Sequence, residues 1–109
     1  MIDGLYAVHF KSSNDEGTGV VAIANGSING GDSGYYYQGT LDQNDQGLST
    51  RLTVTKFNPL AESVFGPLDS FTLELSGPSS ERGFELSGHL VEHSGHKLSV
   101  EGHYLKPLV

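Results

Sequence analysis

Three histidines give this 109-residue chain its best spacing for a metal site. His89, His93 and His96 lie around one predicted hairpin, and three imidazoles with a water in the fourth position can hold zinc. On its predicted strand, however, His89 points away from the apolar face, and the other two belong to a polar turn whose sequence fixes no ligand geometry. Solvated histidines are the favoured interpretation, so we expect no metal and no cofactor.

The segment Gly31-Asp32-Ser33-Gly34 matches the tetrapeptide around the nucleophile of serine proteases. Those enzymes build their catalytic triad between two barrels, which a chain of this length cannot supply. The same residue types are ordinary turn chemistry. The chain also has no Cys, and no pair of carboxylates lies on an apolar stripe where burial would raise a pKa toward catalytic use. We therefore expect no catalytic residue, and an enzyme is the least favoured class.

The charge balance narrows the class of partner. Thirteen Asp and Glu against six Lys and Arg give a net charge of −7, and the six cations are scattered along the chain. This arrangement argues against direct nucleic-acid binding and against anionic membranes, and it favours a basic protein or a cationic ligand. The sequence has no apolar run of about 20 residues and no basic, then apolar, leader, so a cytoplasmic protein is expected.

Short alternating runs predict an all-β chain. The 29 Leu, Ile, Val and Phe residues can form one core, so a single domain over 1–109 is expected. Asn25-Gly26 is typical of a two-residue type I′ hairpin, and a short helical turn or plug is expected near 60–65. The expected strands are 5–11, 19–24, 27–32, 35–41, 48–57, 71–75, 84–90 and 98–104, with a polar turn over 42–47.

About eight strands with one apolar face each, and no long amphipathic stretch, predict a small antiparallel up-and-down β-barrel. The interior of such a barrel is either filled by side chains or able to hold one small ligand. In the triple Tyr35-Tyr36-Tyr37 the side chains must alternate between faces, so they serve either core or dimer packing or a ligand platform. For the case of a hollow interior, the inward phase predicts a cavity lined by Val8, Phe10, Tyr37, Leu52, Val54, Leu73, Leu86 and Val100.

Five segments together resemble the GrlR-like negative regulators of type III secretion, and the resemblance covers essentially the whole chain. It is most specific in the first 41 residues. It implies a lipocalin-like β-barrel with a hydrophobic interior, usually dimeric, that represses by binding a transcriptional activator and performs no chemistry. The segments are Asp3-Gly4-Leu5-Tyr6 with Phe10, Gly17-Thr18-Gly19-Val20, Asn25-Gly26-Ser27-Ile28-Asn29-Gly30-Gly31-Asp32, Tyr37-Gln38-Gly39-Thr40-Leu41 and Leu105-Lys106-Pro107-Leu108.

The resemblance also points to a partner-binding segment, because the best-studied member of that family engages its activator through a surface Glu-Asp-Glu-Asp run just after the Tyr-Gln-Gly strand. The matching stretch here is Gln43-Asn44-Asp45-Gln46, preceded by Asp42, and Asp45 is the one charged residue of the four. The leading hypothesis is therefore a cytoplasmic regulator or adaptor that binds a protein through Asp42, Gln43, Asn44, Asp45 and Gln46. The alternative is a carrier of a small lipid-like molecule in the barrel interior.

Overall fold

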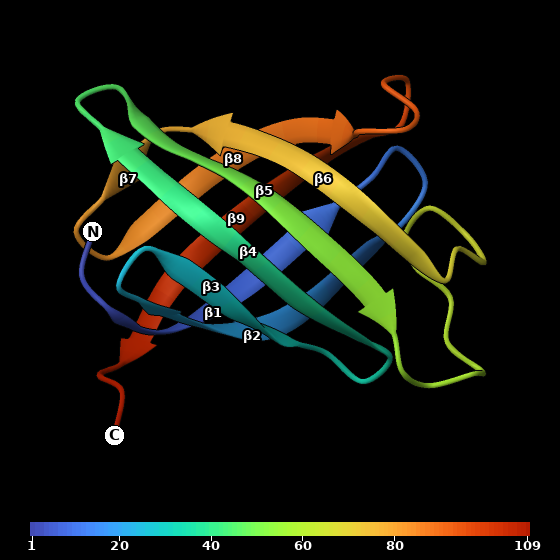
Figure 1. Cartoon of the computed structure of the whole chain (residues 1–109), viewed down its shortest axis with the longest axis horizontal. Coiled ribbons are helices and arrows are strands. Elements are labelled where there is room, and N and C mark those ends of the chain that lie inside the picture. The colour runs from blue at the N-terminus through green and yellow to red at the C-terminus, as the bar shows by residue number, and fades with distance from the viewer.

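The alternating runs form strands throughout the chain. The computed structural model describes all 109 residues and contains nine strands and no helix (Figure 1). The strands are β1 (Gly4–Lys11), β2 (Glu16–Ala24), β3 (Ser27–Gly31), β4 (Tyr35–Asn44), β5 (Gly47–Lys56), β6 (Ser70–Gly77), β7 (Ser79–Ser80), β8 (Gly83–Leu90) and β9 (Lys97–Lys106).

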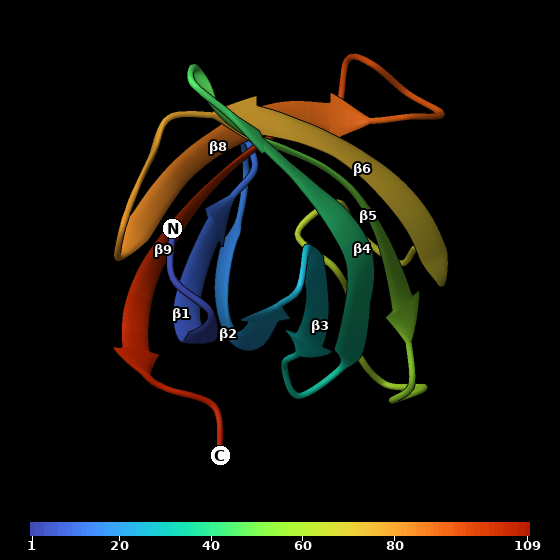
Figure 2. The same cartoon turned by 60° about the vertical axis from the view of Figure 1, so that its left-hand side comes forward.

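All neighbouring strands are antiparallel, in the order β6-β5-β4-β3-β2-β1-β9-β8-β7. An additional pairing of β6 with β8 closes the sheet, so eight strands ring a common interior and the two-residue β7 lies outside the ring (Figure 2). The closing seam is short and joins Leu73–Ser76 to Ser87–Leu90. The expected closed up-and-down barrel is confirmed.

Two hairpin turns set the register between the strands that they join. Asn25 and Gly26 have φ angles of 52° and 76°, which is the type I′ geometry predicted from their sequence. The expected polar turn over 42–47 is shorter than predicted, because β4 continues to Asn44 and pairs it with Gly47. The turn itself is Asp45-Gln46. Polar side chains continue the strand here because they lie exposed at the end of a two-stranded ribbon, where they need no core.

The helical turn expected over 60–65 is absent. The Asn58 side chain accepts a hydrogen bond from the backbone N–H of Leu60 at 3.0 Å, and Ser63 and Gly66 exchange backbone hydrogen bonds of 2.9 and 3.0 Å. Gly66 has a φ of 100°, which reverses the chain without steric cost. These local turns satisfy the backbone and override the weak helical preference of the segment.

The inward-facing side chains form one hydrophobic cluster of 16 buried residues, in which Tyr6 and Leu90 are fully buried. Their outward neighbours on the same strands are mostly polar and more exposed, as expected for an antiparallel sheet with one dry face. The chain forms no helix that could span a membrane.

Candidate functional site

The barrel encloses a cavity of about 520 Å³. Eighteen of its 29 lining residues are hydrophobic, and they come from strands on all sides of the ring. A volume of this size lies within the range of small-ligand pockets. The structure places all eight side chains of the predicted lining on its wall: Val8, Phe10, Tyr37, Leu52, Val54, Leu73, Leu86 and Val100.

Two buried residues of the cavity lining donate hydrogen bonds from their hydroxyl groups to backbone carbonyls. The Thr50 hydroxyl donates to the Thr40 carbonyl at 2.6 Å, and the Tyr35 hydroxyl donates to the Leu68 carbonyl at 2.6 Å. No buried side-chain nitrogen or oxygen of the protein lacks a partner. The deep wall therefore offers dispersion contacts and burial, but no unpaired group for a polar ligand.

Tyr37 links the cavity wall to the β3–β4 turn. Its hydroxyl donates a hydrogen bond to Oδ2 of Asp32, while Oδ1 of Asp32 accepts from the backbone N–H groups of Gly34 and Tyr35 at 2.8 Å each. Burial, followed by the hydrogen bond to the Asp32 carboxylate, raises the pKa of Tyr37. The Gly-Asp-Ser-Gly segment is thus a turn organised by its aspartate, as the sequence predicted.

A small residue is needed opposite Tyr37. A Cβ atom added to Gly19 would lie 2.9 Å from the Tyr37 hydroxyl oxygen and 2.9 Å from the Gly31 carbonyl oxygen. The Tyr37 ring also packs edge-on against Phe10, with 6.2 Å between ring centroids. Strand β2 begins at Glu16, three residues earlier than predicted, so Gly19 lies inside the strand instead of at its start.

The connection between β5 and β6, residues 57–69, lies at one end of the barrel, and we call this end the mouth. The Ser12 hydroxyl donates to the Val64 carbonyl at 2.8 Å, and the Phe57 N–H donates to the Gly34 carbonyl at 2.9 Å. The connection is thereby tied to both the β1–β2 and the β3–β4 turns. Its residues Asn58 and Ala61 to Phe65 line the cavity, as a plug would, although without helical structure.

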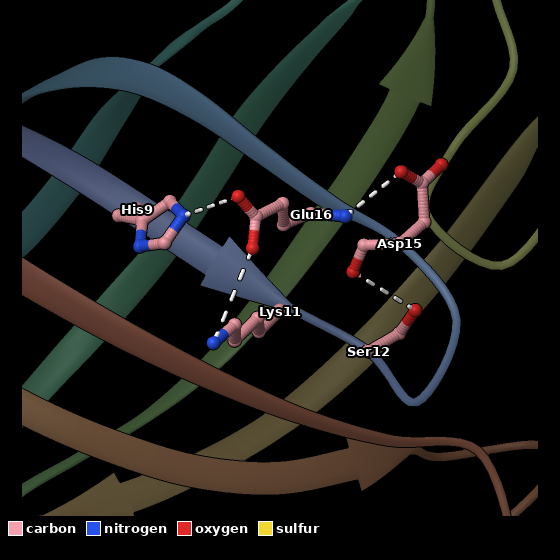
Figure 3. Close-up of polar contacts among 5 residues, drawn as sticks. All are labelled: His9, Lys11, Ser12, Asp15 and Glu16. Atoms are coloured by element: carbon pink, nitrogen blue, oxygen red, sulfur yellow. Dashed lines mark hydrogen bonds and ion pairs between the residues drawn. The ribbon is translucent and has the colours of Figure 1, made fainter.

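The mouth is acidic. Asp15, Glu16, Asp32 and Glu62 line the cavity there, and no Lys, Arg or His side chain does. Glu16 contacts two basic residues on the outer face of β1: its carboxylate lies 3.7 Å from His9 Nε2 and 4.0 Å from Lys11 Nζ (Figure 3).

These mouth residues lie in turns or at strand ends and lack periodicity, so the sequence did not indicate them. The net negative charge of the connecting loops was the one feature of the sequence that could have pointed to these residues.

The predicted partner-binding residues lie at the opposite end of the molecule. Asp42, Gln43, Asn44, Asp45 and Gln46 are all exposed and form the tip of the β4–β5 hairpin. In Figure 1 this tip and the mouth connection stand at opposite ends of the barrel. The hairpin tip and the cavity mouth are consequently two separate surfaces.

The three histidines weighed as metal ligands do not converge. Nδ1 of His89 lies 2.9 Å from the backbone carbonyl oxygen of Leu90. The rings of His93 and His96 pack against each other in the β8–β9 turn, with 5.5 Å between their centroids. His96 also contacts Phe65 of the mouth connection. No group of three or more His, Cys, Asp or Glu side chains is placed to hold a metal ion.

A closed antiparallel barrel with an apolar interior defines a lipocalin-like β-barrel protein. A family model described as "T3SS negative regulator, GrlR" matches residues 1–108. The chain therefore belongs to the GrlR family of negative regulators of type III secretion systems. No curated protein matches the sequence.

Proposed function

We propose that this protein represses type III secretion in the cytoplasm by binding a protein partner, such as a transcriptional activator, without catalysing a reaction. The observation that carries this proposal is the family match, which extends over residues 1–108. The match covers every strand of the barrel, so the regulatory role is proposed for the whole chain.

The β4–β5 hairpin tip, residues 42–46, is the proposed contact surface. It carries the carboxylates of Asp42 and Asp45, and both are exposed. The chain as a whole has a net charge of −7. A basic partner would be steered toward such a surface, and charge complementarity would fix its orientation more than its affinity.

A pull-down combined with a reporter tests this role. The tagged protein and an Asp42→Asn/Asp45→Asn variant are used as baits in the host, and captured proteins are identified by mass spectrometry. We expect a transcriptional activator with the original protein, a weaker signal with the variant, and higher expression from a secretion-gene reporter when the protein is deleted. Recovery of no partner, together with an unchanged reporter, would overturn the proposal.

A second function, carriage of a lipid-like molecule, is favoured by the cavity. Its volume of about 520 Å³ and its mainly hydrophobic lining suit an apolar ligand. Native mass spectrometry of protein purified from its own host tests this directly. A bound molecule of defined mass supports the carrier, and a chain without added mass favours the regulator that acts through its surface alone.

We further propose that two copies associate. Val20 and Tyr36 are 47% and 43% exposed on the outer face of the barrel, and each is the register partner of Gly31 between them. Apolar side chains that adjoin in this way gain by being covered. A sedimentation mass of two chains at micromolar concentration is expected, and a mass of one chain would contradict the dimer.

A further inference from the structure

We propose that the cavity selects an amphiphile with an apolar chain and a cationic head, and discriminates against anionic amphiphiles such as fatty acids. This inference rests on the carrier function proposed above and adds the charge of its ligand. The apolar chain would occupy the interior between Val54 and Leu86, and the head would remain at the mouth near Asp15 and Glu62.

The orientation of the ligand follows from the distribution of polar groups. Deep in the barrel, the hydroxyl of Thr50 already donates to the Thr40 carbonyl, and no buried side-chain nitrogen or oxygen lacks a partner, so a polar head placed there would lose its hydration without gaining a partner. At the mouth the lining includes the exposed polar residues Asp15, Ser33 and Glu62. An amphiphile therefore binds with its chain inward.

The sign of the head follows from the mouth charges. Asp15 and Glu62 line the cavity, are exposed and take part in no ion pair. The other two mouth carboxylates are partly used, because Glu16 contacts His9 and Lys11 while Asp32 accepts three hydrogen bonds.

Lys56, the last residue of β5, lies beside the mouth connection, but its positive charge does not offset the mouth carboxylates. Lys56 is outside the cavity lining, and its Nζ lies 3.4 Å from the Asp69 carboxylate and 5.9 Å from the centroid of the Tyr35 ring. The Asp69 carboxylate therefore balances the charge of Lys56. Four acidic residues and no basic residue line the cavity, and the carboxylates of Asp15 and Glu62 take part in no ion pair. A cleft of one sign with low-dielectric walls concentrates the opposite charge.

Competition among three amphiphiles with the same chain tests the inference. The purified full-length protein is loaded with the uncharged fluorophore N-phenyl-1-naphthylamine, which is displaced by dodecylammonium, dodecanol or dodecanoate below their micelle-forming concentrations. We expect dodecylammonium to bind about tenfold more tightly than dodecanoate, with dodecanol between them, since each exposed charge pair contributes a factor of roughly 1.5 to 5. The difference should shrink in molar salt.

A matched pair of variants assigns the selectivity to the mouth. Asp15→Asn/Glu62→Gln removes two carboxylates at the mouth, and Asp42→Asn/Asp45→Asn removes two at the opposite end, so both variants have the same net charge. All four positions are exposed, which keeps the effect on folding small. The mouth variant should lower the preference for dodecylammonium about threefold or more, and the hairpin variant should leave it unchanged.

The outcomes separate this inference from the carrier function. If neither the fluorophore nor any amphiphile binds, the carrier function fails and the inference fails with it. If dodecanoate binds as tightly as dodecylammonium, or more tightly, the carrier function stands and the selectivity is overturned. Equal losses of selectivity in the two variants would assign the effect to net charge and would likewise overturn the mouth as its source.

Discussion

The Tyr37 hydroxyl donates a hydrogen bond to the Asp32 carboxylate, and this contact joins the cavity wall to the β3–β4 turn. The phenol is 6% exposed, whereas Asp32 is half-buried. One residue therefore belongs to the interior and the other to the mouth. Their hydrogen bond fixes the position of an aromatic ring that would contact the chain of any bound amphiphile.

Stability at alkaline pH should report this contact. The pKa of Tyr37 is raised above its ordinary value of 10.0 in the folded protein, so above about pH 10 the unfolded chain releases a proton that the folded chain retains. Unfolding is then favoured as the pH rises, by up to ~1.4 kcal/mol per pH unit for this group. The pKa of Tyr6 is also raised, mainly by burial, and adds to the same trend.

Comparison with Tyr37→Phe isolates the contribution of this one phenol. At neutral pH the variant should lose about 1.5 kcal/mol of unfolding free energy, the value of a hydrogen bond to a charged group. Between about pH 9 and pH 11 it should lose less additional stability than the original protein. Urea unfolding followed by circular dichroism measures both quantities, and parallel alkaline slopes in the two proteins would contradict this account of Tyr37.

The closing seam should be sensitive to a single methyl group. A Cβ added to Gly88 would lie 1.7 Å from the backbone carbonyl oxygen of Glu74, so β6 and β8 would have to separate where they pair over a short stretch. We expect Gly88→Ala to lower the unfolding free energy by about 2 kcal/mol or more.

A nearby glycine supplies the control for the seam. A Cβ added to Gly95 would meet no atom within 4 Å, so Gly95→Ala should change the unfolding free energy by less than about 0.5 kcal/mol. Chemical denaturation of both variants checks the pair. Equal stability of the two variants would mean that the β6–β8 contact is not the constraint on position 88.

Period-two alternation made the barrel and its inner face predictable. Because side chains alternate between the two faces of a strand, Tyr6, Val8 and Phe10 share one face, and their apolar character places that face inward. The same rule gives the cavity-lining positions on the other strands. The Asn25-Gly26 turn was predictable because its positive φ angles restrict which residues fit. In these cases the determining interactions lie within a few residues along the chain.

Features that depend on distant contacts were not predictable from the sequence. The β6–β8 seam is set by how many strands the ring holds, and the mouth connection is shaped by bonds such as that from Ser12 to Val64. Helical preference over 60–65 was too weak to compete with the side chain of Asn58. The acidic mouth was missed for the same reason, since Asp15 and Glu62 come together through tertiary structure.

Filling the cavity should weaken the binding of an apolar ligand without disturbing the outer surface. Val54 is 5% exposed and lines the cavity, so Val54→Phe would place a ring where an apolar ligand would bind. We expect the affinity for N-phenyl-1-naphthylamine to fall by about tenfold, which corresponds to ~1.4 kcal/mol. Thr53→Phe places the same ring on the outer face of β5, one residue away, and should retain the affinity. Unchanged binding in Val54→Phe would place the fluorophore outside the barrel.

Charge reversal at the hairpin tip should slow association with the regulator's protein partner. Asp42→Lys/Asp45→Lys reverses two exposed carboxylates, so a basic partner would be repelled at the proposed contact and its association rate at low salt should fall by about tenfold or more. Asp15→Lys/Glu62→Lys changes the net charge equally at the opposite end and should slow association far less. Stopped-flow measurements at two salt concentrations test this expectation. Because salt screens the attraction between the hairpin and a basic partner, the association rates of the original protein and the hairpin variant should differ less at the higher concentration. Equal slowing by both variants would show that the partner responds to the total charge of the barrel, and the β4–β5 hairpin would then lose its proposed role as the contact surface.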